Sequence, residues 1–258
     1  MFFHWSVFLY SLIFWIAVEL INAEDMAGFL TDFFSGHVWL FVLSVFFFLA
    51  YIFKVAQKIG KRTELTFIPV ILTFSVFLLS YFIDSINQKH IFALIATAAY
   101  YFLHLGLHRI KLYEKDKTAH AIIAAAASAS VFIFYAGAYG FYLNFNLPLW
   151  ILMLSFFAVT TLISYQYFFL ITQNRKEILK YSLLLGFVMM EVAWAINFWP
   201  FGYLTTSVIT LIFYYMFWDA IQAHILGNLT RKRIVGDVLF FGALVAFVLL
   251  TSRWVAVV

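Results

Sequence analysis

Long apolar runs separated by short polar loops fill the chain. Because about 20 apolar residues in a helix cross the hydrocarbon core of a bilayer, the pattern predicts an all-α, polytopic transmembrane helical bundle of about nine spans. The predicted spans are residues 2–22, 37–57, 66–86, 90–108, 119–140, 148–171, 179–199, 202–226 and 235–256. No stretch between them reaches the size of a soluble domain, about 50 residues. We therefore predict a single transmembrane domain over residues 1–258.

Composition supports the same class. Hydrophobic residues make up 66% of the chain and charged residues only 11%, against about 25% charged in soluble proteins. The chain has no cysteine, which excludes disulfides, thiol nucleophiles and thiolate metal sites. The lipid bilayer is therefore its first expected partner.

Basic residues cluster after every second predicted span. Of the 16 Lys and Arg residues, 14 follow the second, fourth, sixth and eighth spans, which leaves Lys89 and Arg253 on the other side. The 14 are Lys54, Lys58, Lys61, Arg62, Arg109, Lys111, Lys115, Lys117, Arg175, Lys176, Lys180, Arg231, Lys232 and Arg233. Because cytoplasmic loops carry the excess of Lys and Arg, we expect a cytoplasmic N-terminus and an external C-terminus. This topology accounts for the basic charge without a nucleic-acid partner.

The first span is expected to remain as an uncleaved signal anchor. Its first five residues contain no Lys or Arg, the apolar run is long, and Ile21 does not suit a cleavage site after Ala23. Cleaved signal peptides have a basic start, a shorter apolar region and small residues before the cut.

Two carboxylates, Glu191 and Asp219, lie within the seventh and eighth predicted spans. A carboxylate in hydrocarbon costs a few kcal/mol or more unless it is paired, hydrated or protonated, so such residues often serve function. Helical spacing puts Asp219 on one face of the eighth span with Thr205, Val208, Ile212, Tyr215 and Gln222. Glu191 shares a face of the seventh span with Trp194 and Phe198.

The short turn between these spans sets the register of the hairpin. It places Glu191 level with Thr210 and Asp219 level with Ser182. The two carboxylates then differ in depth by about 13 Å, too far to share a proton or a metal ion. One interpretation is a polar path lined by Glu191, Asp219, Tyr215 and Thr210. The alternative is two structural carboxylates, each hydrogen-bonded to a neighbouring helix.

A second candidate site lies in the fourth span, where His104 and His108 are four residues apart. Two histidines at this spacing can reach one ion, as in helical zinc sites. The favoured ligand set is His104, His108 and Asp219, with water in the fourth position of a catalytic zinc ion. The alternative is a hydrogen-bonded core residue at His104 and an interfacial residue at His108.

The C-terminal third carries Glu191-x2-Trp194, then Phe198-Trp199-Pro200, then Tyr214-Tyr215 and His224-x2-Gly227. In these residues the chain resembles uncharacterised multi-span membrane proteins of small-genome bacteria. The resemblance covers about a quarter of the chain and implies no activity. We expect the protein to lie in a bacterial cytoplasmic membrane.

Three functions remain open from the sequence. The first is transport or permeation of a small solute or ion past Glu191 and Asp219. The second is an intramembrane, zinc-dependent lipid hydrolase or transferase that uses His104, His108 and Asp219. The third is a structural subunit of a membrane assembly, either a homo-oligomer or a larger complex.

Overall fold

The computed structural model describes residues 2–22 and 38–252, and this part of the chain contains helices and no strand. The predicted all-α fold is confirmed. The helices are α1 (Phe2–Asn22), α3 (Val38–Gly60), the short 3₁₀ helix η1 (Thr63–Leu65), α4 (Phe67–Ser80), α5 (Ile86–Leu112), α6 (Lys117–Phe145), α7 (Leu149–Ile171), α8 (Arg175–Ile196), α9 (Tyr203–Ile225) and α10 (Arg231–Thr251).

Nine helices in the described residues are long and apolar enough to cross a membrane. Their number agrees with the about nine spans expected, while the crossing of a membrane stays a prediction. Ala23 and Arg253, together with the outermost residues of predicted spans 37–57 and 235–256, lie outside the described residues.

Several helices extend beyond the apolar runs that predicted them. For example, α5 continues through Arg109 and Lys111, α8 begins at Arg175, and α10 begins at Arg231. These ends are basic and polar, so hydropathy does not register them, although Lys and Arg are good helix formers. The Thr230 hydroxyl accepts a hydrogen bond from the backbone N–H of Arg233 at 3.3 Å and caps the start of α10.

The chain forms two compact units, residues 1–130 and residues 131–258, and the boundary lies within α6. We call them the N-terminal unit and the C-terminal unit. The single domain expected over residues 1–258 stays a prediction.

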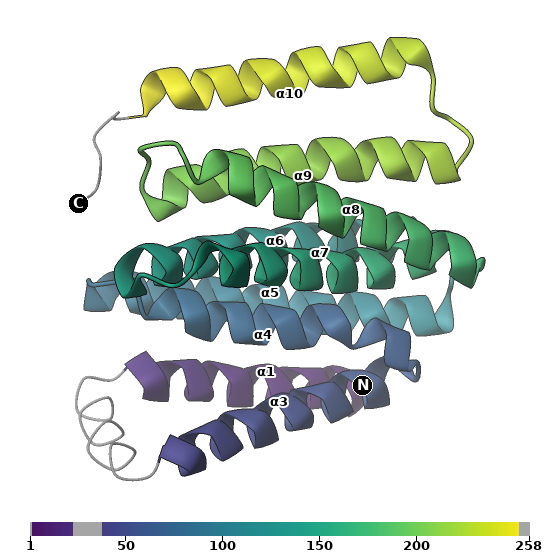
Figure 1. The fold of residues 1–258 in the computed structure, drawn as a ribbon. Coiled ribbons are helices and arrows are strands. Elements are labelled where there is room, and N and C mark those ends of the chain that lie inside the picture. The colour runs from purple at the N-terminus through teal and green to yellow at the C-terminus, as the bar shows by residue number, and fades with distance from the viewer. Residues whose placement is uncertain (1, 23–37, 253–258) are drawn as a thin grey trace. The chain divides into compact units, whose positions relative to one another are not determined.

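In the N-terminal unit, α1 packs against α4 and α5, and α3 packs against α4 and α5 (Figure 1). Phe14 of α1 stacks on Tyr100 of α5 with ring centroids 4.5 Å apart. A hydrogen bond of 2.6 Å joins the carboxylate of Glu19 on α1 to Nδ1 of His90 on α5. Aromatic packing and a polar contact therefore both connect the first helix to the rest of its unit.

In the C-terminal unit, α7 packs against α8 and α9, α8 packs against α9, and α9 packs against α10 (Figure 1). A close approach of α7 and α8 lies at Gly186 of α8. A Cβ atom there would overlap Thr161 Oγ1 and lie 2.9 Å from the Phe157 carbonyl oxygen, both on α7. Gly186 therefore lets two backbones meet, as small residues do in membrane helix pairs.

Candidate functional site

One face of α9 in the C-terminal unit is polar and buried. Thr206, Thr210 and Tyr214 recur every four residues and are each less than 5% exposed. Residues four apart lie one above the other on a helix, so the face continues through Trp218 to Gln222. The Thr210 hydroxyl donates to the Thr206 carbonyl oxygen at 2.7 Å. Thr210, a predicted path residue, therefore lies inside the unit.

Two tyrosines of α6 belong to the same polar interior. The hydroxyls of Tyr135 and Thr160 share a hydrogen bond of 2.6 Å, and both residues are fully buried. The Tyr139 hydroxyl donates to the Ala193 carbonyl oxygen at 3.2 Å and also lies beside Thr210. The ring of Tyr135 stacks on Phe156 with centroids 4.0 Å apart. Both tyrosines are thus held by aromatic packing and by hydroxyl contacts.

Residues of α7 extend the polar interior toward the α9–α10 turn. The hydroxyls of Ser164 and Tyr214 lie beside one another without meeting the geometry of a hydrogen bond. Tyr167 lies beside Gln222, and its ring centroid is 4.7 Å from that of Trp218. We name this set the hydroxyl seam. It comprises Tyr135, Tyr139, Thr160, Ser164, Tyr167, Thr206, Thr210, Tyr214 and Gln222.

An ion pair stands where the hydroxyl seam approaches the start of α10. Arg233 Nη2 donates to both carboxylate oxygens of Asp219, at 2.9 and 2.8 Å. Arg233 Nε also lies 3.8 Å from a carboxylate oxygen of Asp237. Asp219 is 22% exposed and interacts electrostatically with Tyr167 of the seam. The predicted path residue Asp219 is therefore a paired carboxylate at one end of the hydroxyl seam.

The other two predicted path residues lie on exposed surfaces. Tyr215 is 42% exposed, and its ring lies 5.7 Å from that of Phe241 on α10. Glu191 is exposed on α8 and makes no hydrogen bond or ion pair with the residues that the structure describes. The structure thus brings Thr210 and Asp219 to the seam and places Tyr215 and Glu191 outside it.

His104 lies in the interior of the N-terminal unit and is fully buried. Its Nδ1 atom is 2.9 Å from the Tyr100 carbonyl oxygen, and because a carbonyl oxygen only accepts, Nδ1 carries the proton. Its other ring nitrogen, Nε2, then presents a lone pair inside the unit. His108 follows one turn later on α5 and is half-buried.

No group of three His, Asp or Glu side chains in the described parts of the chain is arranged to hold a metal ion. His104 and His108 belong to the N-terminal unit and Asp219 to the C-terminal unit. The zinc ligand set His104, His108 and Asp219 stays a prediction.

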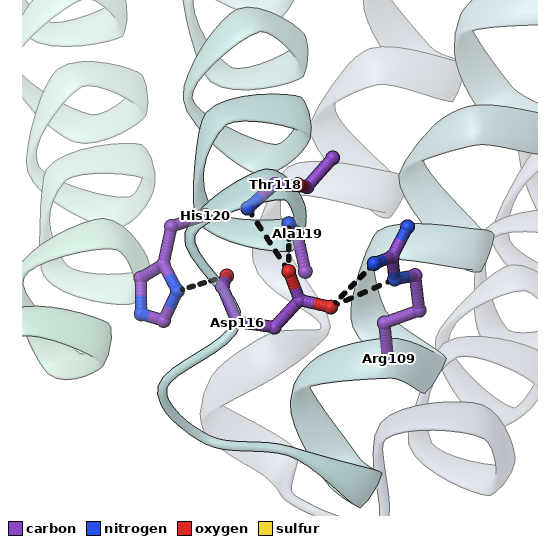
Figure 2. A network of polar contacts seen from close by, with 5 residues as sticks. All are labelled: Arg109, Asp116, Thr118, Ala119 and His120. Carbon is purple, nitrogen blue, oxygen red and sulfur yellow. Dashed lines mark hydrogen bonds and ion pairs between the residues drawn. The ribbon is translucent and has the colours of Figure 1, made fainter.

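A polar network joins α5 to the start of α6 (Figure 2). One carboxylate oxygen of Asp116 accepts from the backbone N–H groups of Thr118 and Ala119, at 2.9 and 3.2 Å. The other accepts from Arg109 at 2.8 Å. These contacts, led by the Ala119 N–H, hold the pKa of Asp116 below its usual range. His120 Nδ1 donates to the Asp116 carbonyl oxygen at 2.8 Å.

Sequence reasoning missed most of the hydroxyl seam and the Asp116 network. A signal for the seam exists in Tyr135 and Tyr139, four residues apart, and in the i, i+4 and i+7 spacing of Thr160, Ser164 and Tyr167. A signal for the network is an Asp directly before a helix, the usual place of a capping residue.

The described residues define an all-helical protein with nine helices that are long and apolar enough to cross a membrane. Residues 53–255 match a family described as "Protein of unknown function (DUF5656)". This match covers well over half of the chain, so the protein belongs to that family. No curated protein and no solved structure matches the chain. The predicted membership of an uncharacterised family is confirmed, while the link to small-genome bacteria stays a prediction.

Proposed function

We propose that the protein is an integral membrane protein that moves protons along the hydroxyl seam, with Asp219 as the ionisable group at one end. The observation that carries the proposal is the length of the polar row on α9, which is buried from Thr206 to Tyr214 and half-buried at Gln222. Thr206 and Gln222 are 16 positions apart on α9, a rise of about 24 Å. The hydrocarbon core of a bilayer is about 30 Å thick, so the seam matches most of that distance.

The packing of the seam favours a proton over a larger solute. Tyr135 and Thr160 have no exposed surface and bond directly to each other. A hydroxyl group both donates and accepts hydrogen bonds, so a chain of hydroxyls can pass a proton when its members rotate. A solute would require the stacked rings of Tyr135 and Phe156 to separate.

Asp219 supplies the group that takes up and releases the proton. Its two contacts with Arg233 hold the carboxylate at the end of the seam. Its electrostatic interaction with Tyr167 connects the ion pair to the seam. Ionisable residues inside membrane bundles commonly mark proton or ion pathways, which supports this role for Asp219.

Proton flux into proteoliposomes tests the proposal. The purified protein is reconstituted with an internal pH-sensitive dye, and a potassium gradient with valinomycin supplies the driving voltage. We expect Tyr214→Phe, which removes one seam hydroxyl and keeps the ring, to reduce the flux at least tenfold. Tyr81→Phe is the matched control, because Tyr81 is 64% exposed and lies outside the seam. Equal flux in all three proteins, or flux no greater than in empty vesicles, would overturn the proposal.

The same proposal includes an orientation: the N-terminus and the basic loops lie in the cytoplasm and the C-terminus lies outside, in a bacterial cytoplasmic membrane. The chain has no native cysteine, so single introduced cysteines report sidedness without background. We expect an impermeant maleimide on intact cells to label exposed positions Ser85 and Asn146 and to spare Lys61, Lys115, Asn174 and Asn228. Labelling of positions from both groups on intact cells would overturn this orientation.

A further inference from the structure

We propose that the exposed face of α8 around Glu191 binds a transmembrane helix of a partner protein that presents a Lys or Arg side chain at the same depth. This inference goes beyond proton movement, because Glu191 lies outside the hydroxyl seam. It assigns to Glu191 a role in assembly.

The face is a continuous stripe of large apolar residues interrupted by one carboxylate. Leu184, Phe187 and Trp194 are 48%, 53% and 47% exposed, and Glu191 is exposed between them. Their spacing of three and four residues puts them on one side of α8. Apolar side chains on this side suit lipid, but an unpaired carboxylate does not.

The depth and direction of Glu191 make contact with water unfavourable. Glu191 is five positions before Ile196, where α8 ends, so its Cα lies about 8 Å below that end. Side chains in a helix lean toward its N-terminus. The carboxylate of Glu191 is therefore directed away from the C-terminal end of α8. A charged group at such depth in lipid is costly unless another group pairs with it.

The described residues of the C-terminal unit offer no Lys or Arg at this depth. In the described part of the C-terminal unit, the Lys and Arg residues all lie in the first two turns of α8 or in the first turn of α10. Lys180, the one farthest along α8, is 11 positions before Glu191, about 17 Å away along the axis. Glu191 thus has no complementary cation within the described C-terminal unit, and the proposal places that cation on another molecule.

Charge also indicates whether the partner at this face is a second copy of the chain or a different protein. Two copies that met through this face would bring two Glu191 carboxylates together, and like charges in a low-dielectric environment repel. A helix with a cation at this level instead gains an ion pair together with contacts to Phe187 and Trp194. The face therefore suits a partner of different sequence.

A reconstituted binding assay tests the proposal with defined probes. The full-length protein, labelled at a cysteine introduced at Asn174, is mixed in phosphatidylcholine vesicles with a labelled single-span Leu-rich peptide. One peptide carries a Lys about 8 Å from the end of its apolar stretch, and the other carries Leu there. By energy transfer, we expect about tenfold tighter association with the Lys peptide, the effect of one polar contact between membrane helices.

Variants distinguish this contact from nonspecific association of apolar helices. Glu191→Gln should remove the preference for the Lys peptide, and Glu191→Lys should transfer it to a peptide with Glu at that position. Glu177→Gln, on the first turn of the same helix, is the control and should leave the preference intact. Equal binding of both peptides, a preference that survives Glu191→Gln, or self-association that depends on Glu191 would each overturn the proposal.

Discussion

Asp219 of α9 and Arg233 of α10 form a bridged ion pair in which one guanidinium nitrogen donates to both carboxylate oxygens. The pair is only partly exposed, and it joins two helices that are otherwise held together by apolar contacts such as those around Val245. It therefore fixes the polar end of the α9–α10 hairpin.

The ion pair predicts a selective loss of stability. Arg233→Gln removes the cation that pairs with Asp219, and we expect the free energy of unfolding to fall by about 1 kcal/mol, near the upper value for partly exposed pairs. Thermal unfolding in detergent, followed by circular dichroism, should show a midpoint about 2–4 °C lower. Arg231→Gln is the matched control, because Arg231 is exposed and two positions away. Equal losses in both variants would show that the pair contributes nothing specific.

The glycine contact between α7 and α8 gives a second prediction. In Gly186→Ala the new methyl group would overlap Thr161 Oγ1 and press on the Phe157 carbonyl oxygen. The two helices must then separate. Overpacking of this kind lowers the free energy of unfolding by about 1–3 kcal/mol. The same unfolding measurement should show a clear decrease in the midpoint.

Gly242→Ala on α10 controls for helix propensity. A Cβ atom at Gly242 meets nothing within 4 Å, and Ala is favoured over Gly in a helix by up to about 1 kcal/mol. We therefore expect no loss of stability there. Adding Thr161→Ala to Gly186→Ala should restore part of the stability that Gly186→Ala loses. A Gly186→Ala protein as stable as the native one would refute the close contact.

The Asp116 network predicts a dependence of stability on acid pH. Contacts to the Ala119 N–H and to Arg109 lower the pKa of the Asp116 carboxyl group in the folded protein. A lowered folded-state pKa stabilises the protein above the unfolded pKa, about 3.9. This contribution is lost as the pH falls from about 4 through the folded-state pKa.

Substitution at Asp116 isolates that contribution. Asp116→Asn should lower the unfolding midpoint at pH 6 and flatten its decrease between pH 5 and pH 3. Asp84→Asn serves as the control, because Asp84 is exposed and has no ion pair among the described residues. It should leave both the midpoint and its pH dependence unchanged. A native-like pH profile in Asp116→Asn would contradict the prediction.

The apolar pattern was sufficient to predict the helices and their number, because a span needs a long apolar run whatever it packs against. It could not predict the helix ends, where residues such as Arg109 and Arg175 continue the helix beyond the apolar region. Helix formation there depends on backbone hydrogen bonds and propensity, which hydropathy does not measure.

Burial was harder to predict than helicity. Tyr214 and Tyr215 are adjacent and chemically identical, yet Tyr214 is 1% exposed and Tyr215 is 42% exposed. In a membrane helix both faces are apolar, so the sequence offers no contrast between lipid and interior. The face predicted from the sequence runs through Tyr215 and Asp219. It is therefore offset by about one residue from the buried face, which runs through Thr210 and Tyr214. Whether Glu191 and Tyr215 line a path stays a prediction.

The length of α6 has a consequence for the membrane around it. Its 29 residues rise about 44 Å, well beyond the roughly 30 Å of acyl chains in a bilayer. An ordinary tilt of about 20° shortens its projection only slightly. In the proposed membrane placement both tips reach the lipid headgroups, where Lys117 and His120 at one tip and Asn144 at the other meet polar surroundings. In that placement a thicker bilayer would draw these tips inward, so we expect the stability of the protein to depend on bilayer thickness.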